Sequence, residues 1–278
     1  MPKPSVTVYL EIFNEEKRIE SCLKSFTWAK ELVVFDKHST DQSLEIARKY
    51  ATEIISLPFT LASENAIRVI STRKSCEWVM FPTASSLIHP LLVREIRKLT
   101  EDNSFEYDVI SLPYGMHSFG INNKKSPWTA SRKNILIRRS ALCVSSKLHN
   151  EIKYESDKIY EIPFINDEAL LYHCTHKDGD DFFNRHMRYT KYEAEYEKHT
   201  PRDKALKQAF FEILKSIYVV VFRRRSFLLG WDGIALSLAY ISYFIMKFIY
   251  TWDIRRDNGN IVYPALQKKI DDLWKNEI

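Results

Sequence analysis

The sequence predicts an α/β fold, with a mainly parallel sheet flanked by helices and a helical appendage at the C-terminal end. Two observations predict it. Short apolar runs alternate with helical patterns from residue 5 to about residue 113, and repeated strand–helix units form a parallel sheet covered on both faces. From about residue 155 the alternation fades, and aromatic and basic residues mix in a helical pattern. We therefore expect two domains, residues 1–155 and 156–278.

The first half contains five expected strands, at 5–13, 31–35, 53–57, 78–81 and 108–113. The first of them alternates apolar and polar positions and is rich in β-branched side chains, as strands are. The expected helices are 15–26, 39–50, 61–76 and 89–99. Asn14 can cap the first helix, and Ser39 with Gln42 has the spacing of a capping box for the second.

Composition excludes some kinds of site and leaves others open. The 278 residues are 45% hydrophobic with a net charge of +5, which allows a sizeable core and suits an anionic partner such as a nucleotide or an acidic membrane. The four cysteines form no C-x-x-C pair, so neither a zinc knuckle nor a disulfide framework is predicted. The six glycines form neither G-x-G-x-x-G nor a Walker loop. The N-terminus lacks the apolar stretch of a secretory signal, so we expect a cytoplasmic protein.

Polar residues follow three of the expected strands, at the edge where parallel α/β sheets bind ligands. They are Asn14, Asp36 and the segment 82–86. The carboxylate of Asp36 can accept a hydrogen bond from the N–H of a uracil-like base; an ordinary turn residue is the alternative. Asp41 can contact a ribose, although a residue in the first turn of a helix more often caps it.

The order of these motifs resembles the family 2 nucleotide-sugar glycosyltransferases of GT-A fold, and more narrowly the branch that includes bacterial lipopolysaccharide-core β-glucosyltransferases. The matching stretches cover most of the chain and are FNEEKRIESCLKSFTWAKELVVFDKHSTDQSLEIARKY, ASENAIRVISTRKSCEWVMF, LIRRSALCVSSKLHNEI, HMRYTKYEAEYE and GWDGIALSLAYISYFIMKF. The first is the most specific, because N-E-E, W-A and D-x-x-S-T-D occur in it together.

The resemblance implies roles for single residues. Asp36 would contact the base, Asp41 would support the nucleotide pocket, and Asn65 would lie near the sugar and phosphates. A solvent-facing position in the middle of a helix is the alternative for Asn65. His149 and Glu151 match a late motif near the diphosphate or acceptor. An inverting transfer needs a base for the proton of the acceptor hydroxyl, and Glu151 is our candidate; surface residues at a strand end are the alternative for both.

One motif of the family is missing. The family's strand at 78–81 is followed by a D-x-D motif that holds Mg²⁺ or Mn²⁺ against the two phosphates, but here those positions are Thr83, Ala84 and Ser85, followed by Ser86. Neutral hydroxyls are poor ligands for a hard dication. We therefore expect a donor site without a required metal cofactor, in which Thr83 and Ser85 hydrogen-bond the phosphates.

Cationic side chains would then compensate the charge of the diphosphate, since an Arg fork binds phosphate oxygens bidentately. Arg138 is counted among the expected nucleotide-binding residues. The full set of candidate cations is Arg68, Arg73, Arg132, Lys133 and Arg138. A solvated basic face is the alternative.

The most apolar region of the chain is 216–256. Its longest uncharged run, between Asp232 and Lys247, is shorter than the roughly 20 residues of a spanning helix. Arginines flank the region, and Trp and Tyr residues occur along it, which is typical of a helix in the membrane interface. We expect peripheral membrane contact through 216–256, on the inner face of the cell membrane; a buried helix pair or a homo-oligomer interface is the alternative.

The leading function is an inverting transfer of a sugar from a nucleoside diphosphate donor to a saccharide or lipid-linked acceptor in cell-envelope glycan synthesis. The missing acidic pair motivates a second hypothesis, a non-catalytic relative that binds or scaffolds. Nucleic-acid binding is disfavoured because the basic residues form no recognised module. The donor sugar, acceptor, linkage and oligomeric state are left open by the sequence.

Overall fold

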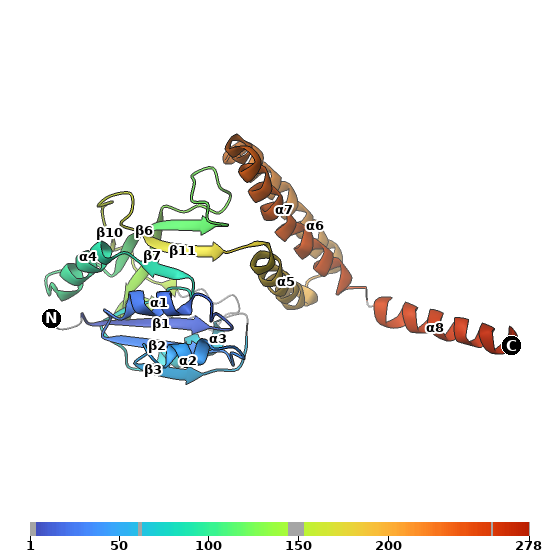
Figure 1. Cartoon of the computed structure of the whole chain (residues 1–278), viewed down its shortest axis with the longest axis horizontal. Helices are drawn as coiled ribbons and strands as arrows, with labels where there is room; N and C mark the ends of the chain where they lie inside the picture. The colour runs from blue at the N-terminus through green and yellow to red at the C-terminus, as the bar shows by residue number, and fades with distance from the viewer. Residues whose placement is uncertain (1–3, 61–62, 144–152, 257, 278) are drawn as a thin grey trace. The chain divides into compact units, whose positions relative to one another are not determined.

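The computed structural model describes residues 4–60, 63–143, 153–256 and 258–277. The chain divides into two compact units, residues 1–122 with 128–177, and residues 123–127 with 178–278. The first unit holds the sheet and the second is helical (Figure 1). The division predicted between residues 155 and 156 moves to residue 177, because strands β10 (Ile159–Glu161) and β11 (Leu171–His176) still belong to the sheet.

The described strands of the first unit form one nine-stranded sheet and one two-stranded sheet. Besides β10 and β11, the large sheet contains β1 (Val6–Ile12), β2 (Glu31–Asp36), β3 (Glu53–Ser56), β4 (Trp78–Met80), β5 (Ser86–Ile88), β6 (Val109–Ser118) and β7 (Arg132–Arg138). The small sheet pairs β8 (Leu142–Cys143) with β9 (Lys153–Tyr154).

The large sheet is mostly parallel, with the order β3-β2-β1-β4-β7-β6-β11-β5, and β10 pairs with β6. Strands β1 to β4 are parallel where they pair, whereas β7 is antiparallel to both its neighbours and β5 is antiparallel to β11. The helices of this unit are α1 (Ile19–Phe26), α2 (Ser43–Ala47), α3 (Glu64–Thr72), α4 (Pro90–Glu101) and the short η1 (Arg139–Ala141). Figure 1 shows β1, β2 and β3 side by side, with α1, α2 and α3 beside them. The predicted mainly parallel sheet flanked by helices is confirmed.

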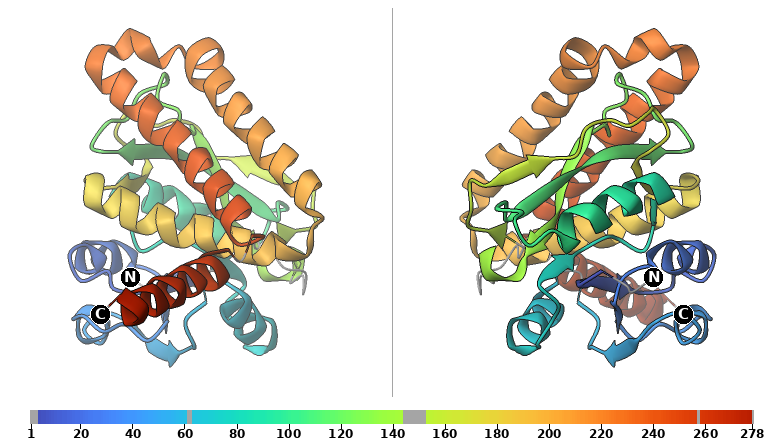
Figure 2. Two further views of the ribbon diagram at one scale, coloured as in Figure 1. Left: turned by 90° about the vertical axis from the view of Figure 1, so that its right-hand side faces the viewer. Right: turned by 90° about the vertical axis from the view of Figure 1, so that its left-hand side faces the viewer.

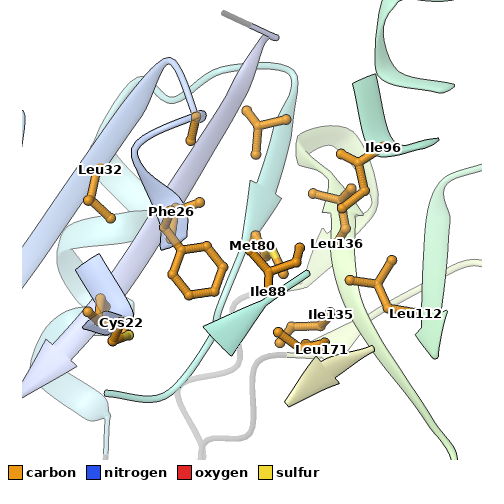
Figure 3. Close-up of a cluster of buried hydrophobic side chains, with 14 of the residues drawn as sticks. Cys22, Phe26, Leu32, Met80, Ile88, Ile96, Leu112, Ile135, Leu136 and Leu171 are labelled. Carbon is orange, nitrogen blue, oxygen red and sulfur yellow. The ribbon is translucent and has the colours of Figure 1, made fainter. Parts of the chain in front are cut away.

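Two buried clusters fill the space between the sheet and its helices. The larger one contains the predicted inner face of α1, where Cys22 and Phe26 are fully buried. In Figure 3, Phe26 gathers with Met80 of β4 and Ile88 of β5. Burying one such side chain stabilises the fold by about 1.5–3 kcal/mol, so this cluster holds α1 against β4 and β5.

The second unit is a helical assembly, as the sequence predicts. Its elements are α5 (Gly179–Tyr196), η2 (Glu197–His199), α6 (Arg202–Tyr218), η3 (Val219–Arg223), η4 (Ser226–Leu229), α7 (Gly230–Asp253) and α8 (Asn258–Glu277). Helix α7 packs against both α5 and α6. Figure 2 shows α6 and α7 as the two arms of a hairpin that is closed at one end by η3 and η4.

A nearly buried lysine joins three helices of this unit. The Nζ atom of Lys247 on α7 lies 3.0 Å from an Oε2 atom of Glu212 on α6 and 3.3 Å from one of Glu193 on α5. The hydroxyl of Tyr243 donates to the other oxygen of Glu193 at 2.7 Å. Burial alone would lower the pKa of Lys247, but the surrounding carboxylates, Glu212 first, raise it above its usual value. Lys247 therefore stays charged and ties α5 and α6 to α7.

Candidate functional site

The loops after β1 and β2 are fastened to each other at the carboxyl edge of the sheet. Ile12 at the end of β1 is opposite Asp36 at the end of β2. Asn14 adopts a left-handed backbone, with φ of 54°. Its N–H donates to Ser39 Oγ at 3.1 Å, and its Oδ1 accepts from the N–H of Thr40 at 2.8 Å. The capping role predicted for Asn14 is wrong, because its side chain bonds the neighbouring loop and α1 begins further along the chain.

Asp36 is a buried carboxylate at this edge. The side chain is 3% exposed, and Oδ1 accepts a hydrogen bond from the N–H of Ser39 at 3.1 Å. Among the described residues, no hydrogen bond to Oδ2 is made. A carboxylate held by one oxygen can accept a further N–H with the other, which is the chemistry that recognition of a uracil-like base requires.

Lys37, the residue after Asp36, was not singled out from the sequence. It is 6% exposed, forms an ion pair with Glu11 of β1, and donates from Nζ to the carbonyl oxygen of Thr60 at 2.8 Å. The pairing compensates a charge that would otherwise be costly to bury. Lys37 thereby anchors the chain after β3 to the same edge, and no local pattern signals a contact between residues so far apart.

Asp41 uses both carboxylate oxygens to order the two loops. Oδ2 accepts from the N–H of Glu16 at 3.0 Å, and Oδ1 accepts from the N–H of Ser43 at 2.9 Å. Burial opposes ionisation, but the hydrogen bonds from Ser43 and from backbone N–H groups lower the pKa of Asp41 below its usual value. Asp41 therefore supports the shape of the edge, and direct contact with a ribose stays a prediction.

Three other predicted residues are not joined to this edge by a described contact. Asn65 lies in the first turn of α3, half-buried, with Nδ2 3.5 Å from the carbonyl oxygen of Pro58. Its role near the sugar and phosphates stays a prediction. His149 and Glu151 lie outside the described residues, so their roles also stay predictions.

The segment in place of the D-x-D motif is a turn closed by its own hydroxyls. Thr83 Oγ1 lies 3.1 Å from Ser85 Oγ and 3.0 Å from Ser86 Oγ. Ser85 and Ser86 are buried, whereas Thr83 is exposed. Cys22 of α1 approaches the carbonyl oxygen of Thr83 with Sγ at 3.5 Å. The turn places one accessible hydroxyl, that of Thr83, after β4.

A second group of side chains borders this turn through the pairing of β5 with β11. Ser86 is opposite His173, and the N–H of Cys174 donates to the carbonyl oxygen of Ser85 at 3.0 Å. Nδ1 of His173 is hydrogen-bonded to the hydroxyl of Tyr114 on β6. Burial lowers the pKa of His173 to about 4, and nearby positive charges act in the same direction. His173 is therefore a neutral imidazole at physiological pH.

Arg138 does not belong to the carboxyl edge. It pairs in register with Trp78, the first residue of β4, so it lies at the opposite edge from the turn that follows this strand. Its guanidinium forms an ion pair with Glu77 and lies 3.6 Å from Asp108, and it covers the ring of Trp78 at 4.6 Å. The predicted nucleotide contact of Arg138 is corrected on these grounds, because β7 runs antiparallel to β4 and carries the side chain away.

Comparison with known proteins finds solved structures that are similar to the chain at low identity. No protein-family profile matches the chain. Residues 1–349 of S. aureus TarS align with it at 15% identity and a TM-score of 0.43, covering 92% of this chain and 91% of that one. Glucosyl-3-phosphoglycerate synthase from Mycobacterium tuberculosis, bound to Mn²⁺, uridine diphosphate and glucosyl-3-phosphoglycerate, aligns at 18% identity and a TM-score of 0.36 over 50% of this chain. The match spans 58% of the length of that synthase.

The prediction that no divalent metal is required is wrong, because the synthase structures contain Mn²⁺ together with uridine diphosphate. The prediction relied on residues 83–86 alone, whereas a metal at a nucleotide is held by phosphate oxygens and water as well as by one or two protein carboxylates. Among the described residues, no group of three or more His, Cys, Asp or Glu side chains is placed to hold a metal. The hydroxyls of Thr83, Ser85 and Ser86 do not by themselves fit a hard dication, so we assign no step to one.

Proposed function

We propose that the chain is a glycosyltransferase of GT-A type, which transfers a sugar with inversion from a nucleoside diphosphate donor to a saccharide or lipid-linked acceptor in the synthesis of a cell-envelope glycan. The observation that carries the proposal is Asp36. A buried carboxylate with one oxygen held by Ser39 and the other without a hydrogen bond from the described residues suits a base N–H. The motif D-x-x-S-T-D, in which Asp36 stands first, supports the lipopolysaccharide-core branch.

The chemistry is a single displacement. The acceptor oxygen forms a bond to the anomeric carbon as the bond from that carbon to the diphosphate oxygen breaks. The proton of the acceptor hydroxyl passes to a base, and the nucleoside diphosphate leaves with the negative charge, so groups that stabilise that charge accelerate the step. Glu151 is the base we propose, and His149 is the second residue we propose for the catalytic step. On the donor side, Thr83 presents its hydroxyl to the phosphates and Asp36 orients the base.

The test is transfer from a panel of nucleotide sugars, with Mn²⁺ in every reaction and product detected by mass spectrometry. We expect a glycosylated acceptor with at least one donor, and at least tenfold less product with Asp36→Asn. Asp157→Asn is the matched control, since Asp157 is an exposed carboxylate of the same unit. Uridine diphosphate binding without transfer from any donor would favour the alternative, a non-catalytic relative.

The second unit supports a place for this reaction at a membrane surface. Large apolar side chains are exposed at the closed end of the α6–α7 hairpin, where Phe222 is 67% and Trp231 is 82% accessible. Arg223 and Arg225 are exposed beside them. Apolar and cationic side chains together suit the interface of an anionic bilayer. We include peripheral membrane contact, on the cytoplasmic side, in the proposal.

One helix in the described residues, Ser226–Asp253, is long and apolar enough to cross a membrane. An 18-residue stretch of it has a mean hydropathy of 1.5, and 11% of that stretch is buried inside the protein. The helix is longer than the uncharged run in the sequence because it extends past both charged residues that bound that run, Asp232 and Lys247. A spanning position would bring Lys247 and its paired carboxylates on α5 and α6 into hydrocarbon, which is costly. This favours a hairpin that lies on the surface.

A further inference from the structure

Most of the cations expected to face a diphosphate are neutralised by carboxylates of the protein. Arg73 lies 2.6 Å from Glu53 in an ion pair, and Arg132 lies 3.1 Å from Glu161. Arg138 is paired at the opposite edge of the sheet, as described above. These guanidinium groups already have carboxylate counter-ions within the protein. Ion pairing that stabilises the fold is therefore sufficient to account for their positions.

Lys133 differs from them. It is half-buried on β7, in register with Leu112 of β6, and no ion pair joins it to a described carboxylate. Burial lowers the pKa of its ammonium group below the usual value. A partly desolvated cation without a counter-ion is costly, and an anionic ligand removes that cost. Arg68, the remaining candidate, is exposed on α3, where no such cost arises.

A hydrogen-bonded pair of side chains near Lys133 supplies a further hydrogen-bond donor. Its Nζ lies 5.3 Å from the centre of the Tyr114 ring, and the Tyr114 hydroxyl is bonded to Nδ1 of His173. When Tyr114 donates to Nδ1, the proton of the neutral imidazole is on Nε2, which is then a donor. Strand β11 carries His173 next to Ser86, the first residue of β5, which directly follows the turn after β4.

Position in the sheet agrees with this chemistry. Met80, the last residue of β4, is opposite Leu136 of β7. Because β7 runs antiparallel to β4, its first residues, including Lys133, lie toward the carboxyl end of β4. The ammonium group is thus at the same edge as Thr83, whereas Arg138 at the other end of β7 is not.

We propose that Lys133 and the Nε2–H of His173, whose imidazole is oriented by Tyr114, form a subsite for a phosphoryl group. That group belongs either to the diphosphate of the donor or to a phosphate carried by the acceptor. The subsite rests on the proposed function only for the identity of the ligand, because binding of a phosphoryl group is measured without any transfer.

Calorimetric titrations with uridine diphosphate, uridine and inorganic pyrophosphate test the subsite, using the full chain and the variants Lys133→Gln and Lys133→Arg. For a donor subsite, Lys133→Gln weakens uridine diphosphate and pyrophosphate by roughly tenfold or more, as expected for a hydrogen bond to a charged group. Uridine binding is unchanged, and Lys133→Arg retains most of the affinity. Lys158→Gln is the control, since Lys158 is exposed in the same unit.

For an acceptor subsite, Lys133→Gln leaves uridine diphosphate unchanged but weakens pyrophosphate by a similar factor when the protein is saturated with uridine diphosphate. If Lys133→Gln is folded by thermal melting and all affinities equal those of Lys158→Gln, the subsite is refuted. A loss of pyrophosphate binding in a protein that transfers no sugar would uphold the subsite and count against the transferase.

Discussion

Gly233 of α7 lies so close to η4 that a Cβ atom on it would be 1.8 Å from the carbonyl oxygen of Ser226. The atom it would meet belongs to the backbone and cannot rotate away. We expect Gly233→Ala to lower the free energy of unfolding of the helical unit by about 1–3 kcal/mol, the usual cost of overpacking. Urea unfolding followed by circular dichroism measures it.

The matched control is Gly179→Ala at the start of α5, where an added Cβ meets nothing within 4 Å. That variant should be as stable as the unmodified protein or slightly more so, because alanine favours a helix. Equal urea midpoints for the two variants would contradict the prediction, because they would show that a Cβ atom at Gly233 is accommodated without loss of stability.

Lys247 provides a second prediction on stability. Lys247→Met leaves the carboxylates of Glu193 and Glu212 without their shared cation. We expect the free energy of unfolding to fall by roughly 2–3 kcal/mol. This is less than the roughly 3–5 kcal/mol for breaking a fully buried pair, because the side chains of Glu193 and Glu212 are still 29% and 27% exposed. Thermal unfolding should show a lower midpoint than for Lys215→Met, which removes an exposed lysine of α6.

Adding Glu212→Gln to Lys247→Met should recover part of the loss, because one unpaired charge is removed. A double variant as unstable as the sum of its single variants would contradict this electrostatic account.

The neutral state of His173 predicts how stability depends on pH. Its pKa is about 4 in the folded chain, whereas an unperturbed histidine, which represents the unfolded chain, has a pKa of 6.5. Between these pH values the unfolded chain binds a proton and the folded chain does not, so stability falls as the pH is lowered through this window. The slope reaches at most about 1.4 kcal/mol per pH unit.

His173→Gln removes this titration. The stability advantage of the unmodified protein over the variant should therefore be larger at pH 7.5 than at pH 5. Besides burial, the positive charges that depress the pKa are Lys133, Arg18 and His176. An advantage that is the same at both pH values would mean that His173 is not held neutral by its surroundings.

Membrane contact is tested by sedimentation with lipid vesicles. The chain should bind anionic vesicles more strongly than neutral ones, and added salt should weaken the binding. Each of Arg223→Gln and Arg225→Gln should weaken it by roughly fivefold, from about 1 kcal/mol per arginine near the surface.

Trp231→Ser should also weaken vesicle binding, whereas Phe164→Ser, at an aromatic residue of the first unit that is 52% exposed, should not. No binding to any vesicle would favour the helix-pair or oligomer alternatives. Extraction by detergent only, never by salt or alkali, would favour a spanning helix.

The strands and the inner face of α1 could be predicted from the sequence because their periodicity is local. Apolar side chains at every third and fourth residue mark one face of a helix, and short apolar runs mark buried strands, so both patterns can be read from neighbouring residues. The end of β2 at Asp36 could be predicted for the same reason. These local patterns were sufficient to place one candidate residue at the carboxyl edge.

Contacts between distant segments could not be predicted in this way. The capping box expected at Ser39 and Gln42 is wrong, because the hydroxyl of Ser39 accepts from the N–H of Asn14 in another loop. His173 carried no signal, since its environment depends on β11 pairing with both β5 and β6. Arg138 was misplaced because the direction of β7 in the sheet is not encoded in its own residues.

Recognition of a nucleoside diphosphate at the carboxyl edge is the claim on which the proposed function depends. Calorimetry with uridine diphosphate on the unmodified chain and on Asp36→Ala tests it, with Asp157→Ala as control. We expect measurable affinity for the unmodified chain and for the control. For Asp36→Ala we expect a loss of about 1.5–3 kcal/mol, or roughly 10- to 150-fold, the range for a hydrogen bond to a charged group. Equal affinity for a folded Asp36→Ala, or no binding by the unmodified chain, would contradict the claim.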